Sequence, residues 1–295
     1  MDRADSMKND LNRVENPERF SGFSATVEVD SELIRRPIGI FDSGLGGLTA
    51  VNAFVKTLPK ESFIYVGDTA RIPYGEKDIE TVSLYGRQIM QFLQKKNIKA
   101  AIVACGTLSS NVIQTLRKEF NIPIIDVVNP GVEACLRLPN LKRVGVIATE
   151  ATIKSGVFPK ILREKNSAIE VEAKACPLFV PLIEEGLAEH PLSRCIANAY
   201  FDDWQKNPID ALILGCTHYP LISSAIQKTL PQTTLVDISV ATLEVAFKIL
   251  EEKSLLNKTG EVVKEFYSSG DTDKFNQLAN QITGMAVDAK KVFWD

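Results

Sequence analysis

Closely spaced metal ligands and paired cysteines are missing from this sequence. Its 295 residues include 2 histidines and 5 cysteines, and no two cysteines form a C-x-x-C pair. A zinc site needs several well-placed ligands and a disulfide framework needs paired thiols, so neither is expected and no metal is assigned. The absence of a G-x-x-x-x-G-K-[ST] motif excludes a P-loop. An odd set of thiols favours a reducing compartment.

An excess of charge of one sign and long apolar runs are also missing. The 34 Lys and Arg residues nearly balance the 37 Asp and Glu residues, so the net charge is -3 and no basic patch for nucleic acid or a membrane surface is indicated. No apolar run approaches the ~20 residues that span a bilayer, and the N-terminus does not resemble a signal peptide. We expect a cytoplasmic protein that acts on a small molecule.

Short apolar runs alternate with longer amphipathic stretches along most of the chain. We expect strands at 37–42, 62–68, 100–105, 122–128, 143–149, 169–175, 210–216 and 233–239, and helices at 80–96, 108–119, 153–163, 191–206, 221–229 and 239–253. This alternation is typical of α/β folds with mainly parallel sheets. Residues 1–36 are polar and have no sustained period, which predicts a disordered tail.

A weak internal repeat predicts two pseudo-symmetric lobes. IGIFDS at 38–43 resembles VGVIAT at 144–149, and each is followed 60 to 70 residues later by a strand that ends at Cys105 or Cys216. We expect one lobe from 37–129 plus 239–295 and another from 130–238, each a mainly parallel sheet flanked by helices. Ligands of such sheets bind beyond the carboxyl ends of the strands, which places the active site in the cleft between the lobes.

A glycine-rich loop, FDSGLGGLT at 41–49, follows the first expected strand. It partly imitates a dinucleotide-binding fingerprint, but Thr49 stands where the last small residue is needed, and Asp42 would repel a pyrophosphate. We interpret the loop as a tight turn that opens a helix, with amides that face a small anionic ligand.

Cys105 and Cys216 occur in similar contexts, AIVACGT and ALILGCTH. Each leaves its strand into a loop that opens a helix, where backbone amides stabilise a thiolate. Two facing thiols can invert a carbon centre, because one removes the α-proton and the other returns a proton on the opposite face. Asp42 is the candidate to share a proton with Cys105, and His218 with Cys216. Glu184 supplies a carboxylate from the second lobe.

Several blocks of the sequence resemble the glutamate racemases of the aspartate/glutamate racemase superfamily. These blocks are IGIFDSGLGGLTAV, IYVGDTARIPYGEK, IVACGTLSS, CPLFVPLIEEG and LILGCTHYPLI, and they follow the family's order and spacing between residues 37 and 249. The resemblance implies a cofactor-independent amino-acid racemase that needs neither pyridoxal phosphate nor metal. It also implies a homodimer that supplies D-glutamate for peptidoglycan in a bacterial cytoplasm.

The same resemblance assigns roles to individual residues. It implies that Cys105 acts on the D-enantiomer and Cys216 on the L-enantiomer, with assistance from Asp42, Glu184 and His218. The positions that hold the substrate fall on Asp42, Ser43, Pro73, Tyr74, Gly75, Gly106, Thr107 and Thr217.

One of these positions departs from the family pattern. Gly106 directly follows the first cysteine, where the family usually has asparagine, so a side-chain contact to the substrate is expected to be lost. A racemase of aspartate or another amino acid therefore stays the alternative. A single-thiol decarboxylase is less well supported because both cysteines are present, and a two-lobed solute-binding protein would be expected to carry a signal peptide.

Overall fold

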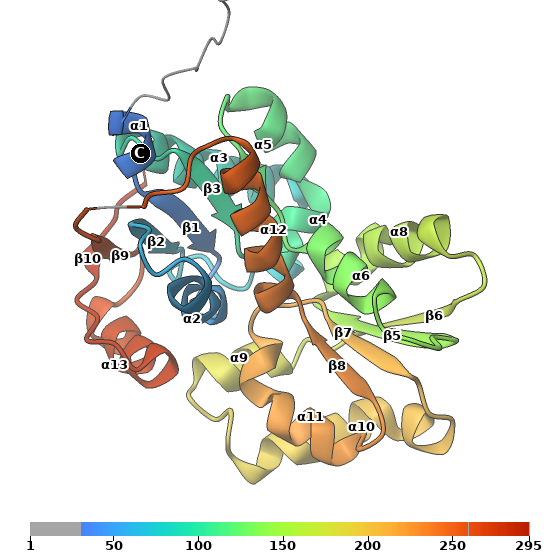
Figure 1. The fold of residues 1–295 in the computed structure, drawn as a ribbon. Coiled ribbons are helices and arrows are strands. Elements are labelled where there is room, and N and C mark those ends of the chain that lie inside the picture. The colour runs from blue at the N-terminus through green and yellow to red at the C-terminus, as the bar shows by residue number, and fades with distance from the viewer. Residues whose placement is uncertain (1–30, 259, 295) are drawn as a thin grey trace, which may run out of the picture.

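The strands of the protein form two parallel sheets, one in each lobe (Figure 1). The structure, a computed structural model, describes residues 31–258 and 260–294. The first sheet has the order β10 (Lys290–Lys291), β9 (Lys264–Ser268), β2 (Phe63–Gly67), β1 (Ile38–Asp42), β3 (Ala100–Val103) and β4 (Ile124–Ile125). The second has the order β6 (Glu170–Ala175), β5 (Arg143–Ala148), β7 (Ala211–Leu214) and β8 (Thr234–Asp237). The expected fold class is confirmed.

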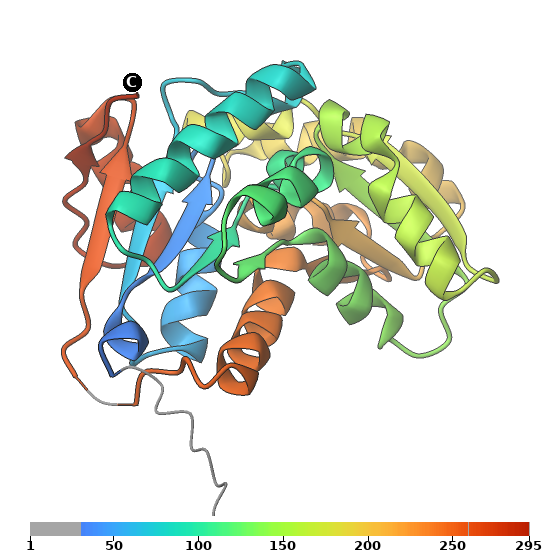
Figure 2. The same ribbon diagram turned by 90° about the horizontal axis from the view of Figure 1, so that it is seen from above.

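Helices cover both faces of each sheet, as Figures 1 and 2 show. The first sheet packs on one face against α2 (Leu48–Thr57), α12 (Ile238–Glu252) and α13 (Thr272–Thr283), and on the other against α3 (Ile79–Lys95), α4 (Gly106–Asn111) and α5 (Ile113–Glu119). The second packs against α9 (Phe179–Glu184), α10 (Pro191–Lys206) and α11 (Ser223–Thr229), and on its other face against α6 (Val128–Leu136) and α8 (Val157–Lys165).

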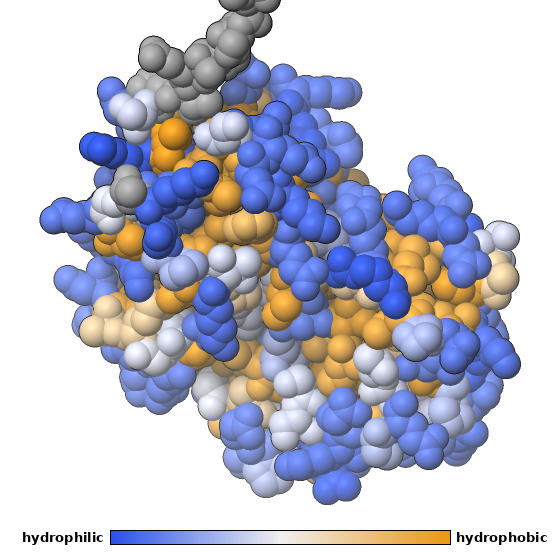
Figure 3. Space-filling model, viewed as in Figure 1, coloured by the Kyte–Doolittle hydropathy of each residue, from blue (hydrophilic) through white to orange (hydrophobic). Residues whose placement is uncertain are grey.

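This covering of both faces explains the apolar character of the central strands. In β1, Ile38 and Ile40 face one helical layer and Phe41 faces the other, and all three are fully buried. Parallel strands that are buried on both faces are apolar at nearly every position. Hydrophilic side chains cover much of the outer face seen in Figure 3, with apolar residues showing between them. Among the described residues, no helix is long and apolar enough to cross a membrane.

Two of the expected helices are interrupted in the structure. The expected helix 108–119 is divided into α4 and α5 at Val112, which has non-helical angles (φ -126°, ψ -2°). The expected helix 153–163 is divided into α7 (Glu150–Ser155) and α8 at Gly156, whose φ of 64° is left-handed. A glycine in this conformation ends a helix readily because it has no Cβ to clash.

The two ends of the described chain hold elements that the sequence did not predict. Of the expected disordered tail, residues 1–30 lie outside the described residues, whereas Ser31–Arg35 form the short helix α1. The buried Lys99 Nζ donates a 2.5 Å hydrogen bond to the Ile34 carbonyl and so attaches this helix to the first lobe. At the other end, β9 and β10 extend the first sheet beyond β2, and α13 packs against it. Only tertiary pairing with β2 reveals β9 as a strand.

Candidate active site

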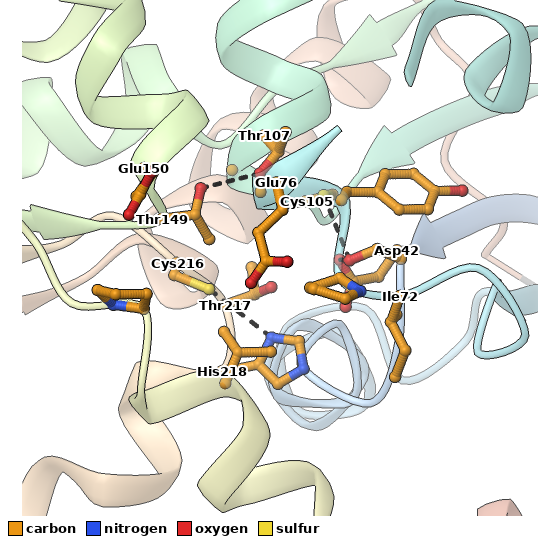
Figure 4. A pocket seen from close by; sticks show the side chains of 17 residues that line it. Asp42, Ile72, Glu76, Cys105, Thr107, Thr149, Glu150, Cys216, Thr217 and His218 are labelled. Carbon is orange, nitrogen blue, oxygen red and sulfur yellow. Dashed lines mark hydrogen bonds between the residues drawn. The ribbon is translucent and has the colours of Figure 1, made fainter. Parts of the chain in front are cut away.

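A pocket between the two lobes brings most of the predicted site residues together (Figure 4). It lies at the carboxyl ends of β1, β3, β5 and β7, where the polar and thiol side chains of both lobes meet. The predicted residues that line it are Asp42, Ser43, Pro73, Tyr74, Gly75, Cys105, Gly106, Thr107, Cys216, Thr217 and His218. Glu184 does not line this pocket. It lies behind His218 and borders a neighbouring cavity with Leu45 and Lys274.

On the first-lobe side, a buried carboxyl group and a buried thiol lie next to each other. Asp42 accepts hydrogen bonds from the backbone amides of Gly47 (2.8 Å) and Gly44 (3.3 Å), both in the glycine-rich loop. Burial nevertheless raises the pKa of Asp42, since its desolvation outweighs these bonds. The Cys105 thiol points to Ser43 Oγ at 3.7 Å.

Contrary to the prediction from the sequence, the loop amides do not bring the pKa of Cys105 below its ordinary value. Burial raises the pKa of Cys105 far above its ordinary value, and the negative charge of Asp42 raises it further. The hydrogen bonds from the Leu108 backbone and from Ser43 act in the opposite direction but are too weak to compensate. The raised pKa favours the protonated form of the Cys105 thiol.

On the second-lobe side, His218 lies between a thiol and a carboxylate. Its Nδ1 is 3.7 Å from Cys216 Sγ, and its Nε2 is 2.7 Å from Glu184 Oε1. The Gly46 amide also points at Nε2 from 3.2 Å. Because the carboxylate is closer and charged, we assign the proton on Nε2 to the bond with Glu184.

This arrangement separates charge inside the second lobe. Burial acts to lower the pKa of His218, but the hydrogen bonds to Cys216 and Glu184 outweigh it and raise that pKa well above its ordinary value. Burial acts to raise the pKa of Glu184, but the hydrogen bond and charge of His218, the Leu45 amide and the charge of Lys274 together outweigh it, and the pKa of Glu184 is lowered. An imidazolium paired with a carboxylate is thus favoured beside Cys216.

The glycine-rich loop of the first lobe packs directly on this pair. The Leu45 amide donates a 2.9 Å hydrogen bond to Glu184 Oε1. A methyl group on Gly46 would lie 2.2 Å from His218 Nδ1, and one on Gly44 would lie 2.4 Å from Glu184 Oε1. The glycines therefore allow contact between the lobes, a role that differs from the binding of a nucleotide phosphate.

Hydroxyl groups and loop backbones supply the remaining polar surface. Thr107 and Thr149 face each other across the lobes with 3.0 Å between their hydroxyl oxygens, and Thr217 Oγ1 donates a 3.1 Å bond to the Ala104 carbonyl. The Tyr74 hydroxyl donates a hydrogen bond to the buried Asp68 carboxylate. Asp68 does not line the pocket, so this hydroxyl adds nothing to the polar surface of the pocket.

Sequence reasoning missed several residues of the pocket lining. They are Ile72, Glu76, Thr149, Glu150, Pro177 and Val180. Thr149 could have been found from the internal repeat, because it ends VGVIAT where Ser43 ends IGIFDS. In Figure 4 the Glu76 carboxylate reaches into the pocket between Cys216 and Asp42. No lysine or arginine is among the described lining residues, so hydroxyls, amides and His218 are the donors present.

The fold and the site define an α/β protein with a buried thiol on each side of an interlobe pocket. A sequence model of the family described as Asp/Glu/Hydantoin racemase matches residues 43–246. This stretch includes both thiols, Asp42's loop partners and His218. Among the described residues, no group of three or more His, Cys, Asp or Glu side chains could hold a metal ion.

Individual relatives narrow this class further. The chain is 42% identical over 256 residues to the glutamate racemase of Persephonella marina, covering 86% of this chain and 96% of that one. The solved glutamate racemase of Francisella tularensis, in complex with D-glutamate, has a TM-score of 0.82 and 38% identity, covering 88% of this chain and 98% of that one. The enzyme from Aquifex pyrophilus has a TM-score of 0.72 and 39% identity, covering 86% and 98%. The chain therefore belongs to the glutamate racemase family and is an isomerase of the amino-acid racemase class.

Proposed function

We propose that the protein interconverts L- and D-glutamate by two-thiol proton transfer at Cα. The observation that carries this proposal is the pair of buried thiols, Cys105 and Cys216, on opposite sides of one pocket, each with its own titratable partner. Glutamate is supported as the substrate by the family and by the D-glutamate complex of the Francisella tularensis relative.

In the L-to-D direction, the Cys216 thiolate takes the α-proton of L-glutamate and becomes a thiol. The pair of electrons left at Cα then takes the proton of the Cys105 S–H bond from the opposite face, which leaves Cys105 as a thiolate and gives D-glutamate. The D-to-L direction exchanges the two roles. Between turnovers, the proton returns by way of Asp42 on one side and His218 on the other.

The resting protonation of the site suits this assignment. Cys105 is held as a thiol by burial and by the Asp42 charge. His218 Nδ1 lies at hydrogen-bond distance from Cys216 Sγ and can accept its proton, while Glu184 stabilises the resulting imidazolium. An inversion by two groups requires different charges on the two sides, and in this proposal His218 supplies that difference by taking the proton of Cys216.

The pocket must also stabilise the charge that develops on the substrate. An amino acid Cα–H is a very weak acid, so preorganised donors and exclusion of water have to supply several kcal/mol. We propose that the hydroxyls of Ser43, Thr107 and Thr217, with the backbone of Pro73, Tyr74 and Gly75, hold the two carboxylates. In this scheme Gly106 contributes only its backbone. No permanent cation of a lysine or arginine is then needed beside Cα.

Serine substitutions of the two cysteines test the mechanism. In heavy water we expect the wild-type protein to incorporate deuterium at Cα of both enantiomers and to invert them. Cys105→Ser should exchange only L-glutamate and Cys216→Ser only D-glutamate, each without inversion, because one face keeps its base. Proton NMR measures the exchange and chiral chromatography the inversion.

Cys195→Ser is the control for this experiment, because Cys195 is exposed and does not line the pocket. It should keep wild-type exchange and racemisation. Racemisation at the wild-type rate by either active-site variant would show that two thiols are not required. Parallel assays with L-glutamate and L-aspartate decide between the proposed substrate and the alternative amino acid.

The biological setting is part of the same proposal. We place the protein in a bacterial cytoplasm, where it supplies D-glutamate for peptidoglycan as a homodimer. Restored growth of a D-glutamate-requiring strain tests the role, and light scattering of the purified protein tests the dimer. The division into lobes of 37–129 plus 239–295 and 130–238 also stays a proposal.

A further inference from the structure

The Glu76 carboxylate lies in the pocket without a partner among the described residues. It ends the short 3-10 helix Tyr74–Glu76, and its side chain reaches into the pocket between Cys216 and Asp42 (Figure 4). Neither a hydrogen bond nor an ion pair joins this carboxylate to another described residue. Ligand pockets fix the orientation of a ligand through a few polar groups, and a charged group without a partner is available for that purpose.

The backbone of Glu76 is held where the two lobes meet. The Tyr74 hydroxyl is bound to the buried Asp68, which attaches the turn to the first lobe. On the other side, Gly75 packs so closely on the second lobe that a methyl group on it would lie 2.7 Å from the Thr149 Cβ. The turn is therefore fixed at both sides, and it directs the exposed Glu76 side chain from the first lobe into the shared pocket.

The two other carboxyl groups among the described lining residues already have partners. Asp42 accepts hydrogen bonds from two backbone amides of the glycine-rich loop and, at 3.5 Å, from the Ser43 hydroxyl. Burial also raises the pKa of Asp42, which favours its uncharged form. Glu150 pairs with Lys154 of the same helix at 3.0 Å. Glu76 is thus the carboxylate of the lining whose charge is least compensated.

The proposed substrate brings a positive charge to this part of the pocket. Its α-ammonium group is bonded directly to Cα, which the two-thiol mechanism places between Cys105 and Cys216. The hydroxyls and loop amides that would hold the carboxylates act as donors, whereas an ammonium group needs acceptors. Gly106, beside Cys105, has no side chain that could accept a hydrogen bond. A carboxylate suits this task because a hydrogen bond between two charged groups is stronger than a neutral one.

We propose that Glu76 binds the α-ammonium group of the substrate and so selects an amino acid over a dicarboxylate that lacks the amino group. This inference deepens the proposed function and rests on it for the identity of the substrate. Glu76 is then a binding residue close to Cα that takes no part in the proton transfer. Its charge repels the two carboxylates of the substrate, so it favours binding only when the ammonium group is present.

Binding of glutamate and of glutarate to the full-length protein tests this assignment. Glutarate has the same chain length and the same two carboxylates but lacks the α-ammonium group. In Glu76→Gln, the Kd for glutamate should rise roughly tenfold, because a hydrogen bond between charged groups becomes a weaker one, while the Kd for glutarate should stay equal or fall. Isothermal titration calorimetry measures both values, with DL-glutamate as the ligand because turnover does not change its composition. Racemisation assays should show the same rise in KM with a smaller change in kcat.

Two further variants complete the comparison. Glu80→Gln removes the same charge from the first turn of α3, at an exposed residue outside the pocket, and should leave the Kd for both ligands unchanged. Glu76→Asp keeps the charge on a shorter side chain and should recover part of the lost affinity for glutamate. Because both positions are exposed, all three variants should keep the melting temperature of the wild type.

Each outcome decides the proposal. Equal losses of affinity for glutamate and glutarate in Glu76→Gln would overturn it, because Glu76 would then only shape the pocket. Tighter binding of both ligands, or an unchanged Kd for glutamate, would overturn it as well. If the wild-type protein does not bind glutamate, the proposed function and this inference fail together. If Glu76→Gln weakens glutamate selectively but the cysteine variants still racemise it, the ammonium site is supported and the two-thiol mechanism fails.

Discussion

His218 connects the chemistry of the two lobes at the scale of single residues. Its ring bonds to Glu184 and faces Cys216 within the second lobe, while the Gly46 amide of the first lobe approaches the same nitrogen that bonds to Glu184. A charge on His218 is thus stabilised by both Cys216 and Glu184, whereas the Gly46 amide points its N–H at the ring. The Glu184–His218 pair should also contribute to stability in a pH-dependent way.

The Glu184–His218 pair predicts how the free energy of unfolding depends on pH. The folded-state pKa of His218 is raised, so its contribution is fully present below the unfolded pKa of about 6.5 and is lost as pH rises through the folded value. The pKa of Glu184 is lowered, so its contribution is present above about 4.5 and is lost as pH falls through the folded value. Glu184→Gln should lower the free energy of unfolding by roughly 3 kcal/mol between about pH 4.5 and 6.5, and by less at higher pH.

Urea unfolding at several pH values measures this difference. Glu185→Gln is the matched control, because Glu185 is the exposed neighbour that pairs with Lys274 at 3.0 Å and lies outside the substrate pocket. Such an exposed ion pair contributes little to the free energy of unfolding. A destabilisation by Glu184→Gln that is independent of pH would contradict the charged pair.

At the scale of secondary-structure elements, the pocket-lining loop after β2 is fixed by the C-terminal segment. The buried Asp68 carboxylate accepts hydrogen bonds from Arg71 Nε (2.6 Å), Ser269 Oγ (2.6 Å), Trp294 Nε1 (2.8 Å) and the Tyr74 hydroxyl. Arg71 also stacks on the Trp294 ring, 4.8 Å from its centroid. The elements that the sequence did not predict, β9 and β10, thus position the loop that lines the pocket.

Trp294→Phe tests this connection, because phenylalanine keeps an aromatic ring and loses the indole N–H. A lost hydrogen bond to a buried charge costs roughly 1–3 kcal/mol, and we expect KM for glutamate to rise several-fold with a smaller effect on kcat. Steady-state kinetics measures KM and kcat, and thermal unfolding measures the loss of stability. Phe293→Ala, at a neighbouring residue that is 78% exposed, should change neither. Equal effects of the two variants would contradict the proposal that Trp294 positions the pocket-lining loop.

At the scale of the whole molecule, backbone and short polar side chains make several of the contacts between the two lobes. The contacts of Gly46 with His218, Gly106 with Gly215 and Thr217 with the Ala104 carbonyl all cross the cleft. A ligand that bridges the lobes should add to these contacts and stabilise the folded protein measurably.

Glutamate at about 100 times its Kd should add about 2.7 kcal/mol to the free energy of unfolding. For a chain of this size, that corresponds to about 5 °C in the melting temperature. Thermal unfolding with and without D- or L-glutamate measures the shift. Leucine carries the same α-groups with an apolar side chain and should cause a much smaller one. Equal shifts with leucine and glutamate would show that the side-chain carboxylate is not recognised.

Much of the architecture follows from local sequence. The apolar runs predict the central strands because β1, β3, β5 and β7 are buried on both faces, and the residues after them reach the pocket. Helix interruptions at Val112 and Gly156 were not predicted, since a helical period continues across both positions. Strand β9 was not predicted either, because its sequence, KEFYS at 264–268, has few apolar residues, and only its pairing with β2 places it in the sheet.

The sequence by itself determined that two thiols, Cys105 and Cys216, stand at the ends of strands in two similar halves, because strand period and chain order fix which residues leave a parallel sheet at its carboxyl edge. Tertiary structure alone decided their surroundings. Burial raises the pKa of Cys105, His218 lies between Cys216 and Glu184, and Gly106 meets Gly215. These features depend on distances between segments that lie far apart in the chain, which no local pattern encodes.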